Sequence, residues 1–242
     1  MRISRLFIDT PLKTGSPVEL NADQLNYVLR VLRLKPGNTV VLFNGQGGEY
    51  TGTIRELHKR NGVIDIETFS DIDNESPLNM TLVQCISRGE RMDLTLQKAT
   101  ELGVQRIVPV FSEHCTVNLE GKRLEKRHAH WLGVIRSACE QSGRNMVPVL
   151  EPATSLDEYL QPVQDNLCLL LDPLADISLR ELATPASPVH LLVGPEGGFS
   201  QHERQRAYDC GYQGVQLGPR ILRTETAAIT AMSAIQLLWG DL

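Results

Sequence analysis

Hydrophobic and polar positions alternate with a short period in the first part of the chain. Apolar runs of strand length recur there, separated by Gly, Pro and Asn residues that favour turns. The runs are RLFI (5–8), TVVLF (39–43), EYTGTIREL (49–57) and VIDIE (63–67). The segment NGQGG (44–48) between the second and third runs predicts a β-hairpin.

One segment of this part has the period of an α-helix. The sequence ADQLNYVLRVLR (22–33) places Leu25, Val28, Leu29 and Leu32 on one face. We therefore expect residues 1–70 to form a small, barrel-like β unit with one helix. The following segment, residues 71–77, is polar and ends in proline, which is typical of a linker.

The pattern changes after residue 78, where predicted strands alternate with predicted helices. We expect strands at residues 79–87, 106–111, 166–172, 189–194 and 214–218. Helices are expected at residues 92–102, before Gly143, after Ser200 and from Thr224 onward. This alternation predicts an α/β domain over residues 78–242, with a mainly parallel sheet covered by helices.

Two of these helices carry start signals. Ser200 followed by Glu203 is typical of a capping box, and Thr224 is expected to cap the last helix. An apolar stripe of the last helix comprises Ala228, Ala231, Met232, Ile235 and Leu238. The helix before Gly143 has a similar stripe formed by Trp131, Val134, Ile135, Ala138 and Cys139.

Charge differs between the two parts of this 242-residue chain, whose net charge is −5. Residues 1–70 carry nine Lys and Arg against seven Asp and Glu, whereas the remainder carries 15 against 22. A more basic front part favours RNA contact there, although a difference of this size also arises by chance. The exposed side of residues 22–33 offers Arg30 and Arg33, with Lys35 just after, as phosphate contacts.

The remaining bulk features point to a cytoplasmic protein. No stretch of about 18 apolar residues predicts a membrane span, and the first residues lack the apolar run of a signal peptide. The five cysteines are scattered and form no CxxC pair. We therefore expect reduced thiols and no metal site.

Three late strands end in turn residues. They lead into Leu171-Asp172-Pro173, into GPEGG (194–198) and into Leu217-Gly218-Pro219. Ligands of open α/β sheets lie beyond the carboxyl ends of the strands, and glycine lets a ligand approach the main chain closely. The three ends therefore predict one pocket for a flat heterocycle. The GxGxxG, GxxxxGK[ST], GxSxG and HExxH signatures do not occur.

Several motifs together carry a family resemblance. They are VLRLKPG (31–37), SRGERMDLTLQKATELGV (87–104), FSEHC (111–115), ACEQSGRNMVP (138–148), LLVGPEGGFS (191–200) and LGPRILRTETAAI (217–229). This set resembles the ribosomal RNA small subunit methyltransferase E family of the SPOUT class, nearly over the whole chain. Members methylate nitrogen 3 of a uridine in 16S rRNA with S-adenosylmethionine (SAM).

The resemblance implies more than the patterns do. It implies a trefoil-knotted α/β fold with helices on both faces of the sheet, and a homodimer whose active site lies near the subunit interface. It also implies that residues 1–70 form a PUA-like RNA-binding domain and residues 78–242 a SPOUT methyltransferase domain. The expected partner is 16S rRNA, within the small ribosomal subunit.

Site residues follow from the same resemblance. It assigns the cofactor to Leu171, Asp172, Gly194, Glu196, Gly198, Leu217, Gly218 and Leu222, for which core packing or turn geometry is the alternative. Glu196 is expected to accept the sulfonium charge or the target's proton, or else to stabilise N–H groups of the following helix.

Basic residues have two interpretations each. Arg220 and Arg223 hold a phosphate or stabilise a uracil anion, or else pair with Glu196 or Glu225. Arg88 contacts RNA or is a solvated surface residue. Glu140 and Arg144 build the dimer-side wall or form a structural ion pair, whereas His114 and His128 are taken as structural.

Two other functions stay open at this point. A SPOUT methyltransferase acting on the ribose 2′-hydroxyl of a tRNA has the same cofactor site. A ribosome-assembly factor that binds RNA and keeps SAM as a structural ligand is the alternative from another class.

Overall fold

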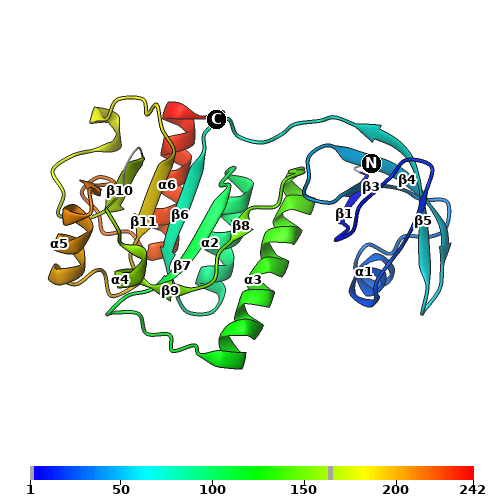
Figure 1. Ribbon diagram of the computed structural model, residues 1–242, viewed down its shortest axis with the longest axis horizontal. Helices are drawn as coiled ribbons and strands as arrows, with labels where there is room; N and C mark the ends of the chain where they lie inside the picture. Colours follow the sequence, from blue (N-terminus) through cyan, green and yellow to red (C-terminus); the bar gives the residue numbers. More distant parts are fainter. Residues whose placement is uncertain (1–2, 163–165) are drawn as a thin grey trace. The chain divides into compact units, whose positions relative to one another are not determined.

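The computed structural model describes residues 3–162 and 166–242, which separate into two compact units. One unit comprises the chain up to Glu75 together with Cys139–Val147, and the other comprises Ser76–Ala138 and Pro148–Leu242 (Figure 1). The segment Cys139–Val147 therefore packs with the front of the chain, although it lies in the middle of the sequence.

The first unit is built on a five-stranded sheet with the order β1-β3-β4-β5-β2. Its strands are β1 (Ser4–Phe7), β2 (Pro17–Glu19), β3 (Thr39–Phe43), β4 (Glu49–Leu57) and β5 (Gly62–Ser70). β1 pairs parallel with β3, and the other pairs are antiparallel. The short β2 was not predicted, because three residues at a sheet edge carry no alternation that stands out from a loop.

The helical segment of this unit is shorter and less regular than expected. An α-helix, α1 (Ala22–Asn26), passes into a π-helical segment at Tyr27–Val31. Leu25 and Val28 are buried in the core as predicted, and Leu29 and Leu32 are partly buried against it. Arg30, Arg33 and Lys35 are exposed.

The segment Cys139–Val147 is fixed within this unit by buried polar contacts. The Arg144 guanidinium pairs with Glu75 at 2.6 Å, and the Asn145 amide donates to the same carboxylate. Arg5 donates to the Asn145 side chain at 2.6 Å and pairs with Glu49. Arg144 therefore forms the structural ion pair that was the alternative to a dimer-side wall.

Glu140 is also engaged inside this unit. Its carboxylate accepts from the backbone amide of Phe7 at 3.0 Å. Burial raises its pKa, although the Phe7 amide, the Tyr27 hydroxyl and Arg5 act against that rise. This position favours a structural role for Glu140 as well.

The second unit is an α/β domain whose strands all pair in parallel, with the order β12-β10-β11-β6-β7-β8. The strands are β6 (Met80–Cys85), β7 (Arg106–Phe111), β8 (Val149–Leu150), β10 (Leu167–Leu171), β11 (Val189–Val193) and β12 (Gln213–Val215), with β9 (Thr154–Ser155) on β7. The mainly parallel sheet predicted from strand–helix alternation is confirmed.

Helices lie against this sheet. One face packs on α4 (Leu156–Tyr159) and α5 (Gln201–Asp209), through a core that includes Val83, Val108 and Leu170. The alternate strand residues, such as Leu82 and Leu191, are fully buried on the opposite face. There α6 (Thr224–Trp239) packs on β11 and on α2 (Glu90–Glu101). The long helix α3 (Gly121–Ser142) follows β7, and its residues from Cys139 onward belong to the first unit.

The start of α5 agrees with its sequence signal, whereas the start of α6 does not. The capping box of Ser200 and Glu203 is present at α5. Thr224 is not the cap of α6, because Arg223 occupies that position and the Thr224 hydroxyl donates to the Gly194 carbonyl instead. Leu238 is 43% exposed, so it does not share the burial of the other residues of the predicted apolar stripe.

Neither a membrane-spanning helix nor a cluster of metal-ligating side chains occurs among the described residues. No helix within residues 3–162 and 166–242 is long and apolar enough to span a membrane. The same residues contain no cluster of His, Cys, Asp and Glu arranged to hold a metal ion. All five cysteines are free, and burial raises the pKa of the Cys139 thiol to about 12.

Candidate functional site

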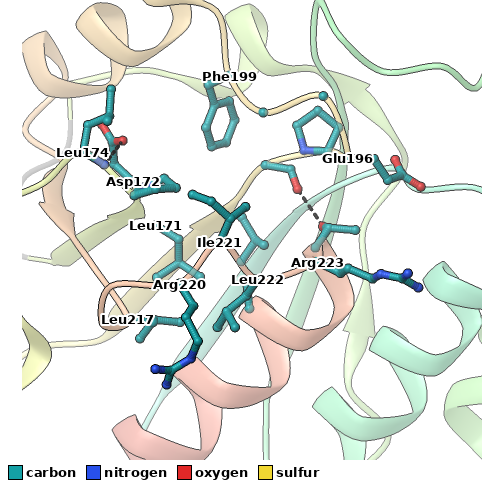
Figure 2. A pocket seen from close by; sticks show the side chains of 18 of the residues that line it. Leu171, Asp172, Leu174, Glu196, Phe199, Leu217, Arg220, Ile221, Leu222 and Arg223 are labelled. Atoms are coloured by element: carbon teal, nitrogen blue, oxygen red, sulfur yellow. Dashed lines mark hydrogen bonds between the residues drawn. The ribbon is translucent and has the colours of Figure 1, made fainter.

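A cavity of about 640 Å³ lies beyond the carboxyl ends of β10, β11 and β12. Three loops form its walls: the first follows β10, the second is the glycine-rich turn after β11, and the third connects β12 to α6. Parallel pairing brings the three strand ends to one edge of the sheet (Figure 2). The cavity volume lies within the range of small-molecule sites.

The structure brings together the residues expected at the cofactor. Lining residues include Leu171, Asp172, Gly194, Glu196, Gly198, Leu217, Gly218 and Leu222, as well as Arg220 and Arg223. The cavity is also lined by residues that were not predicted at it: Arg91, Leu174, Phe199, Arg204 and Ile221. Leu174 and Ile221 are 73% and 80% exposed, so apolar surface is open to a ligand at the mouth.

Two of these loops expose their main chain at a glycine that lines the cavity. Gly198 has φ +70° and Gly218 has φ +78°, a region that L side chains rarely adopt. A Cβ built at either position meets no atom within 4 Å. Glycine therefore serves both the conformation of the loop and open access to its main chain.

The first loop is fixed by a buried carboxylate. Asp172 is 4% exposed and accepts from the Leu174 amide at 2.9 Å and from the Tyr208 hydroxyl at 2.8 Å. An Arg204 nitrogen lies 3.7 Å from it. Burial and the Asp172 carboxylate raise the pKa of Tyr208 to about 12, which keeps the hydroxyl protonated as a donor. Asp172 thus shapes the loop with its side chain.

The second loop is fixed through Glu196. Its carboxylate accepts from Arg91 at 3.0 Å and from the Arg88 backbone amide at 3.3 Å. Partial burial alone raises the pKa of Glu196, but hydrogen bonds from its own amide and that of Arg88, with the Arg91 guanidinium, outweigh burial and lower it. Glu196 is therefore ionised near neutral pH and already engaged by cationic and amide donors.

Further contacts hold the same loop from other elements. The Thr224 hydroxyl donates to the Gly194 carbonyl at 2.6 Å and accepts from Gln84 at 3.0 Å. A ring nitrogen of His114 lies 3.1 Å from the Gly198 carbonyl oxygen. His114 was taken as structural, and this contact on the loop is consistent with a positioning role. Together with Arg91, these contacts hold one short turn from three other parts of the chain.

The third loop presents two arginines. Arg220 and Arg223 are exposed, and neither makes an ion pair within the parts of the chain that the structure describes. Glu196, the partner considered for them, pairs with Arg91 instead. In Figure 2 the Arg223 guanidinium extends toward the side of the cavity where Glu196 lies, whereas Arg220 points the other way.

The expected RNA contacts are not part of this cavity. Arg30, Arg33 and Lys35 are exposed on the first unit, and the Arg88 side chain is exposed in the loop before α2. Arg33 has φ +52°, the one left-handed residue other than glycine among those described. A left-handed arginine at the surface is held there by its surroundings rather than by its own preference.

The residues present fit a nucleoside-type cofactor such as SAM. The buried side chains of Leu171 and Val193 give an apolar wall, and open main chain lies at Gly198 and Gly218. A flat base between apolar side chains, read by main-chain hydrogen bonds, suits such a lining. The ionised Glu196 at the mouth complements a positively charged group.

Comparison with known proteins identifies related sequences over the same regions. The family model described as RNA methyltransferase domain matches residues 74–236. A second model, described as RNA methyltransferase PUA domain, matches residues 20–67.

Relatives match over nearly their full length. A protein named ribosomal RNA small subunit methyltransferase E from Buchnera aphidicola is 35% identical, over 100% of this chain and 98% of the relative. The protein of the same name from Rickettsia conorii is 33% identical, over 98% of this chain and 97% of the relative. The crystal structure of such an enzyme from Neisseria gonorrhoeae, bound to S-adenosyl methionine, is 42% identical with a TM-score of 0.93, and both chains are covered completely. A methyltransferase from Legionella pneumophila in complex with SAM is 38% identical with a TM-score of 0.97, again with complete coverage of both chains.

Proposed function

The chain belongs to the ribosomal RNA small subunit methyltransferase E family, and on that premise we propose that it transfers a methyl group from SAM to nitrogen 3 of a uridine in 16S rRNA. The observation that carries the proposal is the cavity at the carboxyl ends of β10, β11 and β12. Relatives of 42% and 38% identity bind SAM in their crystals.

The proposed cofactor contacts divide into two kinds. Main-chain groups of the loops at Gly194, Gly198 and Gly218 read the adenine edge and ribose. Side chains of Leu171, Leu217 and Leu222 hold the base and exclude water. When bound, SAM supplies an electrophilic methyl group. The protein's own task is to aim donor and acceptor, and orientation of this kind contributes several kcal/mol.

Deprotonation of the target nitrogen, with the proton released to solvent, is the second task. A uracil nitrogen that carries a proton is a poor nucleophile, so the site must favour its anion. Arg220 and Arg223 have no ionic partner among the described residues and are the proposed cations for this purpose. Glu196 has a lowered pKa and two donors, so its charge, rather than proton uptake, is the role that its surroundings favour.

Other features of the proposal come from the family. We propose that the carboxyl-terminal part forms a trefoil knot and that residues 1–70 close into a PUA-like barrel. Residues 71–77 would be the linker and residues 78–242 the SPOUT methyltransferase domain. A homodimer with the active site near its interface and a cytoplasmic location complete the proposal. Support includes the PUA match at residues 20–67 and the contact between Thr224 and the loop at Gly194.

The test uses tritium-labelled SAM with the purified protein and small ribosomal subunits or 16S rRNA lacking the modification. We expect label in the RNA and 3-methyluridine on mass spectrometry of the nucleosides. Label in the ribose of a tRNA would instead favour the 2′-hydroxyl alternative. RNA binding without transfer to any of these substrates would favour an assembly factor and reject the proposed reaction.

A further inference from the structure

A dense group of cations begins helix α3 in the second unit. Lys122, Arg123, Lys126 and Arg127 lie within six residues of a chain that has 24 Lys and Arg in total. The first three side chains are exposed and Arg127 is half-buried. None of the four makes an ion pair with residues in the described ranges. We refer to these four residues as the α3 basic face.

Helical spacing puts these cations on one side of α3. Positions 122, 123, 126 and 127 are related by three and four residues, and so is His130 to the last two. His130 lies 2.8 Å from Asp93 in the first turn of α2. The α3 basic face therefore continues on the side of α3 that meets the start of α2, and Figure 1 shows these helices as neighbours.

The rise of the helix places the α3 basic face beside the loop before α2. Arg123 precedes His130 by seven residues, or about 10 Å along the axis. That loop carries Arg88, and the first turn of α2 carries Arg91, which lines the cofactor cavity and pairs with Glu196. Cations thus lie at the cavity, at the start of α2 and on the first turns of α3.

Two acidic residues on this path are already paired, Asp93 with His130 and Glu196 with Arg91. The others are exposed: Glu90 at the start of α2, Glu120 before α3 and Glu125 on the adjacent side of α3. The path stands out because the chain as a whole is acidic, with a net charge of −5. Concentrated positive charge on an acidic protein indicates a specific polyanionic partner rather than non-specific binding. The amino end of the long α3 adds a partial positive charge.

We propose that the α3 basic face binds the phosphate backbone of the RNA strand that flanks the target nucleotide. The surface is additional to the RNA contacts expected on the first unit. The inference rests on the proposed function, because an RNA methyltransferase must hold the strand on both sides of a base that enters its cavity. Phosphate contacts of this kind fix position without reading sequence.

The test is the double variant Arg123→Gln and Lys126→Gln with a 16S rRNA transcript, measured by filter binding over a series of salt concentrations. Each lost phosphate contact lowers the slope of log affinity against log salt by about 0.7–0.9. Two contacts correspond to roughly a 25- to 60-fold loss of affinity at about 0.1 M salt, if the lines meet near 1 M. SAM affinity is expected to be unchanged.

Matched single variants control for the change of net charge. Lys126→Gln should lower the slope, whereas Arg180→Gln, which removes an exposed cation from the short helix Leu179–Glu181, should not. Equal slopes for the double variant and the wild type would overturn the proposal, as would equal effects of the two single variants. Failure of the wild type to methylate any RNA would reject the proposed function, and the binding comparison would still decide the role of the surface.

Discussion

Substitution of Gly198 tests the effect of a side chain on cofactor binding separately from its effect on the stability of the fold. Gly198 has φ +70° and lines the cavity, and a Cβ built there meets no atom within 4 Å. Gly211, in the turn after α5, has φ +93°, equally open space and no place in the cavity lining. The pair is therefore matched in backbone strain and differs in position.

The expected stability effects of Gly198→Ala and Gly211→Ala are similar. A left-handed conformation costs an L-residue about 1–2 kcal/mol, and the smaller conformational freedom of the unfolded chain offsets about 0.4–1 kcal/mol of that. We expect each variant to lose up to about 1.5 kcal/mol of unfolding free energy. Gly198→Val should lose more, because a β-branched residue is less compatible with positive φ.

Ligand affinity should distinguish the two positions. A methyl group at Gly198 projects beside the main chain that is proposed to face SAM, so Gly198→Ala should weaken SAM binding at least tenfold, or about 1.4 kcal/mol. Gly198→Val should abolish it, and Gly211→Ala should leave it unchanged. The measurements are isothermal titration with SAM and denaturant unfolding of each variant. Wild-type SAM affinity in folded Gly198→Val protein would refute the assignment of the cavity.

Three further substitutions test single contacts. Arg91→Gln should raise the pKa of Glu196 toward its usual value. Because the ionised carboxylate is lost as pH falls through that pKa, the pH below which SAM affinity declines should be higher in the variant. An unchanged pH dependence would contradict the role of the pair. Tyr208→Phe should destabilise the fold by about 1–3 kcal/mol in denaturant unfolding, because the buried Asp172 loses a donor; unchanged stability would show that this hydrogen bond is dispensable. Arg33→Gly should weaken RNA binding in filter assays without lowering stability, since glycine suits its left-handed backbone; unchanged RNA affinity would remove Arg33 from the contacts.

The sequence predicts most strands of both units because their apolar runs are continuous and bounded by turn residues. The predicted bounds of β3, β4 and β7 agree with the structure. The two-residue strands β8 and β9 were missed, since they exist through pairing with β7. The π-helical segment at Tyr27–Val31 was missed as well, because apolar spacing over five residues does not distinguish it from an α-helix.

The features of the site that depend on local sequence were predicted, whereas those that depend on long-range contacts were not. Glycines after strands and the parallel sheet order were enough to place the three loops at one cavity. The partners of the loop carboxylates were not foreseen: Tyr208 lies 36 residues from Asp172, and Arg91 lies 105 residues from Glu196. Thr224 was assigned to a helix cap because sequence alone cannot show the carbonyl of Gly194 beside it.

These long-range contacts explain how a glycine-rich turn can serve as a binding surface. A segment such as GPEGG has large conformational freedom when it is free, and ordering it on ligand binding would reduce affinity. In this structure Thr224, His114 and Arg91 hold its carbonyl and carboxylate oxygens from three other elements. The ordering cost is then met during folding, and the bare main chain at Gly198 is already presented to a ligand. The turn therefore depends on those side chains for its shape and on its glycines for access.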